Sequence, residues 1–346
     1  MPAFYFDILK YMELYTAEGW INAGSIISEG LAFNFLTGGR GIGKTYGFLD
    51  WFLRNRIPFI FMRRTQVEAD LQGDPATSSL TANLTALDME VKYQKLVKGK
   101  LIQVTDAADG REICICCALS TFHSVRGIDL SRYRFLVYDE FITEPHVKTM
   151  RAEGLALFNV YESVNRNREL AGQDPLILIG LSNSLNIAND IFIQFDLVTA
   201  AEQMINNGNE VYRSGKIQLI IFQHSPISER KADTALYQTA SEEYARMALK
   251  NEFILNDFSY VKKRSLKEYT AVWSVGDLYI YRHKHRDEFY CCFSRAKLPK
   301  NQQYGSNYLD LERMKKEKIR YWFRYIEGLI SFESYKAAAL FEKYYK

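Results

Sequence analysis

The sequence is poor in the residues and segments that mark several common classes of protein. Its 346 residues include only five cysteines and five histidines, and no apolar run approaches the roughly 18 residues that a membrane helix requires. The cysteines fall in two strand-like runs without Cys-x-x-Cys spacing, and neighbouring strand residues point to opposite faces, so we expect no zinc site. No histidine stands with a serine or cysteine and an acid in a recognisable order, so triad chemistry has no support.

The amino terminus lacks the basic-then-apolar layout of a secretory signal peptide. We therefore expect buried free thiols in a reducing cytoplasm at Cys114, Cys116, Cys117, Cys291 and Cys292. The hydrophobic content of 47% and charged content of 25% are those of a globular protein, and the length suffices for two domains.

The most informative segment is a phosphate loop of the form G-x-x-x-x-G-K-T. An apolar run at 31–36 predicts a strand before it, and 46–53 predicts a helix after it. Glycines allow successive N–H groups to point at phosphate oxygens, and the helix N-terminus adds positive potential. Lys44 would reach the β- and γ-phosphates, and the Thr45 hydroxyl would ligate Mg²⁺. The predicted nucleotide-binding residues are Gly38, Gly39, Arg40, Gly41, Ile42, Gly43, Lys44, Thr45 and Tyr46.

A second segment supplies the acids that hydrolysis needs. The apolar run 134–138 leads into Asp139 and Glu140, and the carboxyl edge of strands in an open α/β sheet faces the ligand. We expect Asp139 to hold Mg²⁺ and Glu140 to polarise the attacking water. Phosphoryl transfer requires a metal, a water-orienting group and cations, which makes Lys44 and Glu140 catalytic candidates.

Strand-like and helix-like segments alternate over the first 200 residues, which predicts an α/β fold. The candidate strands are continuous apolar runs, typical of parallel strands covered on both faces: 31–36, 57–62, 112–119, 134–138 and 176–181. We predict a P-loop ATPase domain over residues 1–200 with a mostly parallel central sheet.

Residues 201–346 do not continue this alternation of strands and helices. Residues 201–250 are mostly helical in pattern, with a strand at 217–222, and are predicted to be a linker or hinge subdomain. A small α+β C-terminal domain is expected over 251–346. Its predicted strands and helices are 260–264, 270–274, 277–283, 288–295, 309–329 and 332–345.

Charge is distributed unevenly along the chain. Residues 1–260 carry 25 Lys+Arg against 31 Asp+Glu, whereas residues 261–346 carry 19 against 10. A basic end on an acidic body favours contact with a polyanion or an acidic protein surface, and a solvated basic face is the alternative.

Further cations lie near the predicted site. Arg63 and Arg64 end the strand at 57–62, where they either face an anion or are solvated. Arg166 and Arg168 follow the helix predicted at 154–164, where ring-forming NTPases place an arginine finger, although helix-terminal arginines also complement the helix dipole. Arg126 is a weaker candidate for a neighbouring site.

Ser182 and Asn183 follow the strand 176–181. They are predicted to sense the γ-phosphate or the attacking water, with a helix cap as the alternative. Arg40 would contact phosphate or serve only as a spacer within the loop.

This set of motifs resembles the phage DNA-packaging ATPases, the terminase large-subunit class, and most closely the short encapsidation ATPases of podovirus-type phages. The resemblance is specific over roughly residues 30–195 and implies an ASCE-type P-loop fold. It also implies a homomeric ring, a pentamer on the capsid, that uses ATP and Mg²⁺ to move double-stranded DNA. By this resemblance Arg166 is the trans-acting finger, Arg126 and Arg168 are secondary trans-acting candidates, and Ser182 and Asn183 form the coupling motif.

The same resemblance implies partners and a location. The ring would act in the cytoplasm of the infected bacterial host, transiently attached to the portal vertex of a procapsid, with a structural RNA as an open possibility and no membrane. Full-length terminases carry an RNase H-like nuclease with clustered carboxylates. Here 260–264 is basic, and Asp257, Asp277 and Asp310 are scattered, so we predict a vestigial, inactive nuclease-like docking domain.

Two rival functions remain at this level. A helicase or AAA+ machine would separate the strands of a forked duplex, and a nucleotide switch would bind ATP without turnover. For a packaging motor, the weak candidates that grip the DNA backbone are Lys92, Lys95, Lys98 and Lys100, which a solvated hairpin would also explain.

Overall fold

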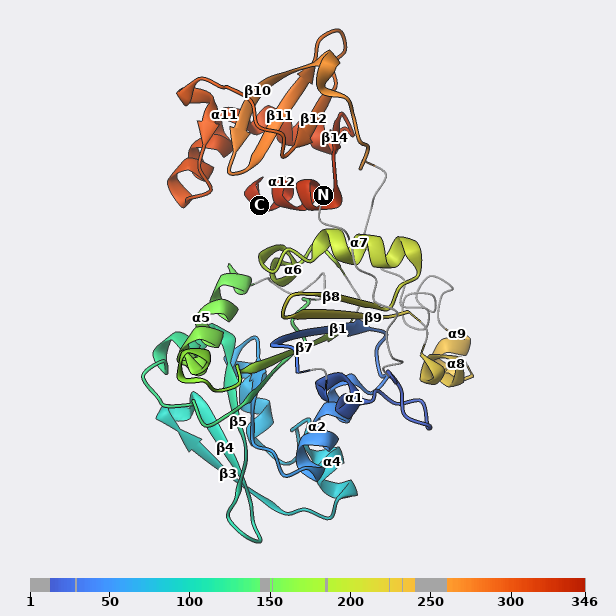
Figure 1. Ribbon diagram of the computed structural model, residues 1–346, viewed down its shortest axis with the longest axis vertical. Coiled ribbons are helices and arrows are strands. Elements are labelled where there is room, and N and C mark those ends of the chain that lie inside the picture. Colours follow the sequence, from blue (N-terminus) through green and yellow to red (C-terminus); the bar gives the residue numbers. More distant parts are fainter. Residues whose placement is uncertain are drawn as a thin grey trace. The chain divides into compact units, whose positions relative to one another are not determined.

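The computed structural model describes residues 13–28, 30–143, 150, 152–183, 186–223, 225–231, 233–239 and 260–345. The chain forms two compact units, one around a nine-stranded sheet and one around a five-stranded sheet (Figure 1). Asn186–Gln203 belong to the second unit, and the chain returns to the first at Met204.

The large sheet has the strand order β3-β4-β5-β2-β6-β7-β1-β9-β8. Six neighbouring strands from β5 to β9 are parallel, and antiparallel strands close both edges. The bounds are β1 Phe33–Gly38, β2 Phe59–Arg63, β3 Val91–Leu96, β4 Leu101–Asp106, β5 Glu112–Ala118, β6 Phe135–Asp139, β7 Ile177–Asn183, β8 Val211–Ser214 and β9 Ile217–Phe222. The mostly parallel sheet expected from the apolar runs is confirmed.

Short helices connect these strands. In the first unit the described helices are α1 Ala23–Ser28, α2 Lys44–Arg54, α3 Gln66–Asp70, α4 Thr81–Ala86, α5 Glu153–Asn165, α8 Pro226–Lys231 and α9 Ala235–Thr239. The helices predicted after the phosphate loop and before the two arginines are confirmed as α2 and α5.

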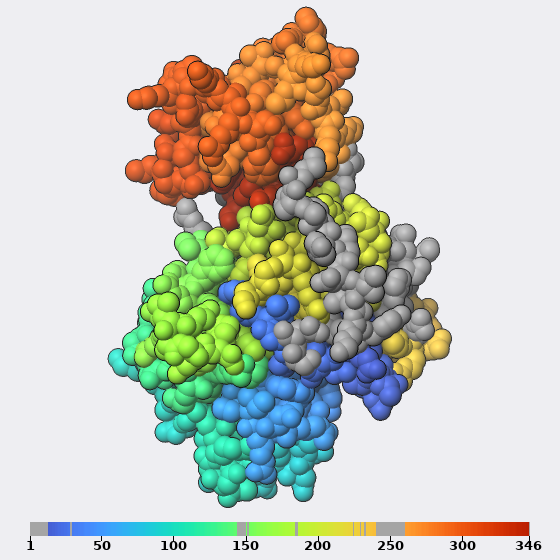
Figure 2. Space-filling view, in the orientation of Figure 1, coloured from blue at the N-terminus to red at the C-terminus, as the bar shows by residue number. Residues whose placement is uncertain are grey.

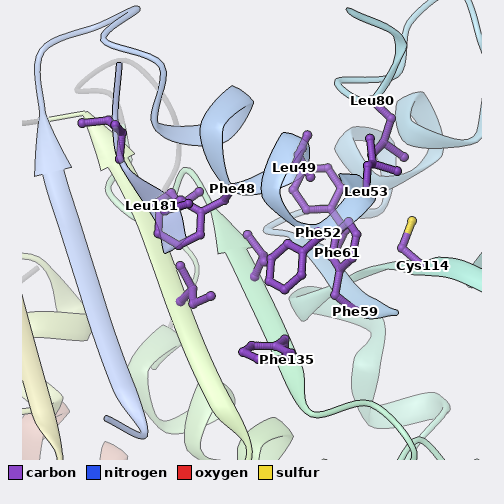
Figure 3. Close-up of a cluster of buried hydrophobic side chains, with 14 of the residues drawn as sticks. Phe48, Leu49, Phe52, Leu53, Phe59, Phe61, Leu80, Cys114, Phe135 and Leu181 are labelled. Carbon is purple, nitrogen blue, oxygen red and sulfur yellow. The ribbon is translucent and has the colours of Figure 1, made fainter. Parts of the chain in front are cut away.

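Helix α2 is held on the sheet by aromatic packing. Its residue Phe52 is buried among Phe59, Phe61 and Phe135 of the neighbouring strands, and Phe48 is buried beside Leu181 (Figure 3). The rings of Phe52 and Phe59 stack with centroids 4.5 Å apart. Because each buried ring contributes about 1.5–3 kcal/mol, this contact fixes the start of α2 at the carboxyl edge of the sheet.

The second unit has the sheet order β13-β10-β11-β12-β14. Strands β10, β11 and β12 are antiparallel neighbours, whereas β13 and β14 pair in parallel at the edges. The bounds are β10 Tyr269–Val275, β11 Leu278–His283, β12 Phe289–Cys292, β13 Gln303–Tyr304, β14 Ile330–Phe332, α11 Tyr308–Ile326 and α12 Tyr335–Tyr345. Helix α6 Asp190–Gln194 also belongs to this unit, and α7 Val198–Asn207 begins in it and ends in the first unit. This is the small α+β domain expected at the C-terminus.

Three parts of the sequence reading need correction. The strand expected at 217–222 is confirmed as β9, but β8 and β9 of the expected linker 201–250 belong to the large sheet, with β9 directly beside β1, so the sheet does not end near residue 200. The expected strand 260–264 makes only a single bridge from Val261 to Phe332, because the three basic residues after Val261 are exposed and offer no apolar face. The expected helix at 332–345 begins only at Tyr335, since Phe332 ends β14.

The cysteine prediction holds, because all five cysteines are buried and none forms a disulfide. Within the described part of the chain, no helix is long and apolar enough to span a membrane.

Candidate nucleotide site

The phosphate loop joins the carboxyl end of β1 to the first turn of α2. Gly41 and Gly43 have φ angles of 72° and 87°, which side chains rarely adopt. A Cβ at Gly43 would also lie 2.7 Å from the ring of Trp20, and Ile42 is fully buried. Glycine is therefore required at both turns, as the motif predicts. Tyr46, by contrast, begins an exposed face of α2.

Lys44 lies inside the curl of its own loop. Its ammonium donates to the carbonyl oxygens of Gly38 at 3.0 Å and Gly39 at 2.8 Å, and lies 3.4 Å from Oδ1 of Asn183. Burial lowers the pKa of Lys44 to about 7, an effect that the negative charge of Asp139 opposes. A buried ammonium without a direct ion pair favours the arrival of an anion.

Thr45 and Asp139 meet at the proposed metal position. The Thr45 hydroxyl donates to Oδ1 of Asp139 at 3.0 Å. Both are hard oxygen donors, and Mg²⁺ typically takes only one or two protein oxygens beside waters and substrate phosphates. The residues present therefore fit Mg²⁺, even though no cluster of three His, Cys, Asp or Glu side chains is found among the described residues.

Arg63 connects the two acids. Its guanidinium is 2.7 Å from Oδ2 of Asp139 and 2.6 Å from Oε2 of Glu140. Burial raises the pKa of Asp139, and Arg63 works against that rise. The sequence left open whether Arg63 faces an anion, and the structure pairs it with both predicted acids, Asp139 and Glu140.

A buried network supports the backbone of Glu140, whose φ of 59° is unusual for a residue with a side chain. Arg64 donates to the Glu140 carbonyl at 2.9 Å and pairs with Glu153 at 3.1 Å. The Tyr138 hydroxyl donates to the same Glu153 carboxylate. Sequence reasoning missed Glu153 and Tyr138. No motif marks Glu153, a buried residue at the start of α5, and Tyr138 reads only as part of the apolar strand β6.

Ser182 and Asn183 lie at the end of β7, between β1 and β6. The Ser182 hydroxyl accepts from the backbone N–H of Ile142 at 3.0 Å, just beyond the acid pair. Asn183 accepts from Lys44. The two residues thus contact both the phosphate loop and the acid segment, as a coupling motif would, and they do not cap a described helix.

The predicted trans-acting arginines lie elsewhere. Arg166 caps the end of α5, where it contacts Asp129 at 3.1 Å and the Ile128 carbonyl at 3.1 Å. Arg168 donates to the carbonyls of Ser131 and Tyr133, before β6. Both arginines therefore lie beside the amino ends of the strands, at the opposite edge from the phosphate loop of their own chain. Arg126 is exposed in the loop that leads to β6.

The candidate DNA-gripping lysines lie on the β3–β4 hairpin at one edge of the sheet. Lys92 and Lys95 are exposed on β3, and their odd spacing places them on opposite faces of the strand. Lys98 is exposed in the turn, while Lys100 donates to the Ser124 hydroxyl at 2.8 Å. The four lysines therefore do not share one face.

A further lysine reaches the phosphate loop from a segment assigned to a linker. Lys231, the last residue of α8, donates to the backbone carbonyl of Arg40. The sequence offered no signal for this contact, because it depends on the pairing of β9 with β1.

Comparison with known proteins identifies the family of this chain. Residues 17–282 match the model of the podovirus DNA encapsidation protein (Gp16) family. The DNA packaging proteins of Bacillus phages PZA and phi29 are each 28% identical over 262 residues, which is 73% of this chain and 71% of theirs.

Two solved structures share the fold. The Phi-28 gp11 DNA packaging motor aligns with a TM-score of 0.64 at 18% identity, over 95% of this chain and 98% of that one. The bacteriophage Phi-29 genome packaging motor assembly aligns with a TM-score of 0.61 at 21% identity, over 94% and 99%. Since the family model covers most of the sequence, the chain belongs to the podovirus DNA encapsidation protein (Gp16) family.

Proposed function

We propose that this protein is the ATPase of a phage DNA-packaging motor and hydrolyses ATP to drive double-stranded DNA into a procapsid. The observation that carries this proposal is the meeting of Lys44, Thr45, Asp139 and Asn183 at one edge of the sheet. The position of β7 between β1 and β6 supports an ASCE-type ATPase, since it places a sensor residue between the loop and the acids.

We assign a separate role in ATP hydrolysis to each group of site residues. The loop backbone and Lys44 bind and orient the phosphates. Glu140 orients the attacking water, and Arg63 and Arg64 hold its carboxylate and carbonyl. Thr45 and Asp139 would hold Mg²⁺, which offsets the negative charge of the phosphates when bound. Asn183 and Ser182 would pass the state of the site from Lys44 to the segment after Glu140.

The proposed finger acts between subunits. Arg166 lies at the amino edge of its own sheet, so it would complete a site only if a ring neighbour presents its phosphate loop there. A homomeric ring, a pentamer at the portal vertex in the host cytoplasm, satisfies this condition. The basic C-terminal unit would serve as a vestigial nuclease-like domain that docks on portal, DNA or a structural RNA, without nuclease activity.

Two carboxylates of the C-terminal unit support this view of the domain. Asp277 faces Arg295, whereas Asp310 accepts from the amide of Asn307 at the start of α11. Asp257 lies outside the described residues. An acid bonded to the N-cap residue of a helix and an acid that faces a surface arginine have structural partners in place of a shared metal.

The test is DNA-stimulated ATPase activity of the full chain. Glu140→Gln and Lys44→Ala are expected to lower turnover by at least about 100-fold, because each removes a charge used in the transition state. Asp174→Asn is the matched control, since it removes an exposed carboxylate paired with Arg134 on the surface. Full turnover by Glu140→Gln would remove this residue from the mechanism, and strand separation on a forked duplex would favour a helicase.

A further inference from the structure

Helix α8 lies beside the nucleotide site because of the strand order. Strand β9 runs parallel to β1 with Phe222 opposite Gly38, so both carboxyl ends reach the same edge of the sheet. The chain then turns into α8 a few residues later. The α8 region, gold in Figure 2, lies next to the blue N-terminal segment that precedes β1.

Two contacts seat α8 on the N-terminal turn. A Cβ at Gly19 would lie 2.9 Å from the Cβ of Pro226, the first residue of the helix. Arg230 donates to the backbone carbonyl of Glu18. The same N-terminal segment carries Trp20 against Gly43 of the phosphate loop. The helix, the turn and the loop therefore form one packed group within the first unit.

The end of α8 touches the loop directly. The Lys231 ammonium donates to the Arg40 carbonyl, and a Cβ at Gly41 would overlap with that ammonium and lie 3.1 Å from Cε. The positive charge of Lys231 thus lies against the part of the loop that curls around phosphate. Burial lowers the pKa of Lys231, and Arg40 adds to this effect.

Two lysine ammonium groups, those of Lys44 and Lys231, contact the loop. Among the described residues, Asp139 and Glu140 are the acids whose charges act on Lys44, and both are engaged by Arg63. Lys44 and Lys231 repel each other, which contributes to the lowered pKa of Lys44. A polyphosphate in the loop would offset the positive charges of Lys44 and Lys231. It would also give Lys231 a charged phosphate oxygen as acceptor in place of the neutral Arg40 carbonyl, and a charged acceptor makes a stronger hydrogen bond.

We propose that Lys231 is a second lysine of the nucleotide site that acts within its own subunit, moving its ammonium from the Arg40 carbonyl to the phosphate chain of bound nucleotide. This inference rests on the proposed ATPase function. By this proposal, α8 positions Lys231, and bound nucleotide holds α8 against the phosphate loop. Because α8 belongs to the stretch that follows the large sheet, the contact would report the occupancy of the site to the part of the chain that leads toward the C-terminal unit.

The test is equilibrium binding of fluorescent mant-ATP and mant-ADP to the full chain. Loss of a charge-assisted hydrogen bond in Lys231→Ala is expected to weaken both affinities about tenfold or more. Lys231→Arg keeps the charge and is expected to recover most of the affinity. Lys216→Ala is the matched control, because it removes an exposed lysine from the turn between β8 and β9, at the opposite end of β9 from the phosphate loop.

The outcomes separate the two proposals. Unchanged nucleotide binding in Lys231→Ala would overturn the role of Lys231. Equal weakening in Lys231→Ala and Lys216→Ala would also overturn it, because the loss would then reflect the net charge of the protein and not a contact with the nucleotide. Lys44→Ala tests the ATPase function independently. If Lys44→Ala binds ATP as tightly as the wild type, the proposed function itself fails, whatever Lys231 does.

Discussion

The buried pair of Arg64 and Glu153 offers a quantitative test of how the catalytic edge is held. The guanidinium and the carboxylate lie 3.1 Å apart, with 6% and 4% of their side chains exposed. Glu153 also accepts from Tyr138, and Arg64 also donates to the Glu140 carbonyl. Loss of one partner therefore leaves the other charge in the protein interior without this ion pair.

We expect Arg64→Leu and Glu153→Leu each to destabilise the first unit by about 3–5 kcal/mol, the usual cost of breaking a buried ion pair. The double variant leaves neither charge behind, so its cost should be close to that of one single variant. Both single variants should also lower ATPase turnover. Arg64→Leu removes the donor to the Glu140 carbonyl, whose residue has a left-handed conformation, and Glu153→Leu removes the carboxylate that orients this donor.

Hydrogen exchange on peptides covering β2 and β6 measures the local free energy of opening, which avoids treating a two-unit chain as a single transition. The surface pair of Arg134 and Asp174 is the matched control, since exposed ion pairs contribute about 0–1 kcal/mol. The reasoning is refuted if the two buried substitutions are additive, or if each costs less than about 1 kcal/mol.

Three further predictions concern the loop, the thiols and the finger. Gly43→Ala should weaken ATP binding and lower the free energy of unfolding by about 1–3 kcal/mol, because Gly43 has a positive φ and a Cβ there would meet the Trp20 ring. Gly30 also has a positive φ but has nothing within 4 Å of an added Cβ, so Gly30→Ala should lower the thermal stability less. Burial raises the pKa of the thiols of Cys114, Cys117, Cys291 and Cys292. A thiol reagent at pH 8 should therefore label fewer than about one cysteine per native chain, and all five after denaturation. Rapid labelling of the native chain would contradict the buried placement of the cysteines. Arg166→Ala subunits mixed into wild-type rings should lower DNA-stimulated ATPase activity more than in proportion to their share, and a proportional decline would show that Arg166 acts on no neighbour.

The parts of the site that are local in the sequence could be predicted from it. The phosphate loop, the strand before it and the helix after it follow from glycine spacing and apolar runs, and β1 and α2 appear within two residues of their expected positions. The acids could be found for the same reason, because Asp139 and Glu140 end a run that is apolar throughout. Such signals depend on backbone sterics and burial over fewer than about ten residues.

Contacts between distant segments could not be predicted in this way. Arg63 lies on both acids because β2 pairs with β6, and Asn183 reaches Lys44 because β7 pairs with β1. The apparent linker became part of the sheet because β9 pairs with β1 on its other side. An apolar run signals that a strand is buried but carries no information about its neighbour.

The sequence by itself therefore determined the two motifs on which the proposed chemistry depends: a glycine loop typical of phosphate binding and a strand that ends in two acids. The tertiary structure alone decided which side chains surround that chemistry: the arginine that joins the acids, the buried glutamate beneath them and the lysine that reaches the loop from α8. The physical reason is that steric and hydrophobic preferences act along the chain, whereas the order of strands in a sheet depends on the packing of the whole unit.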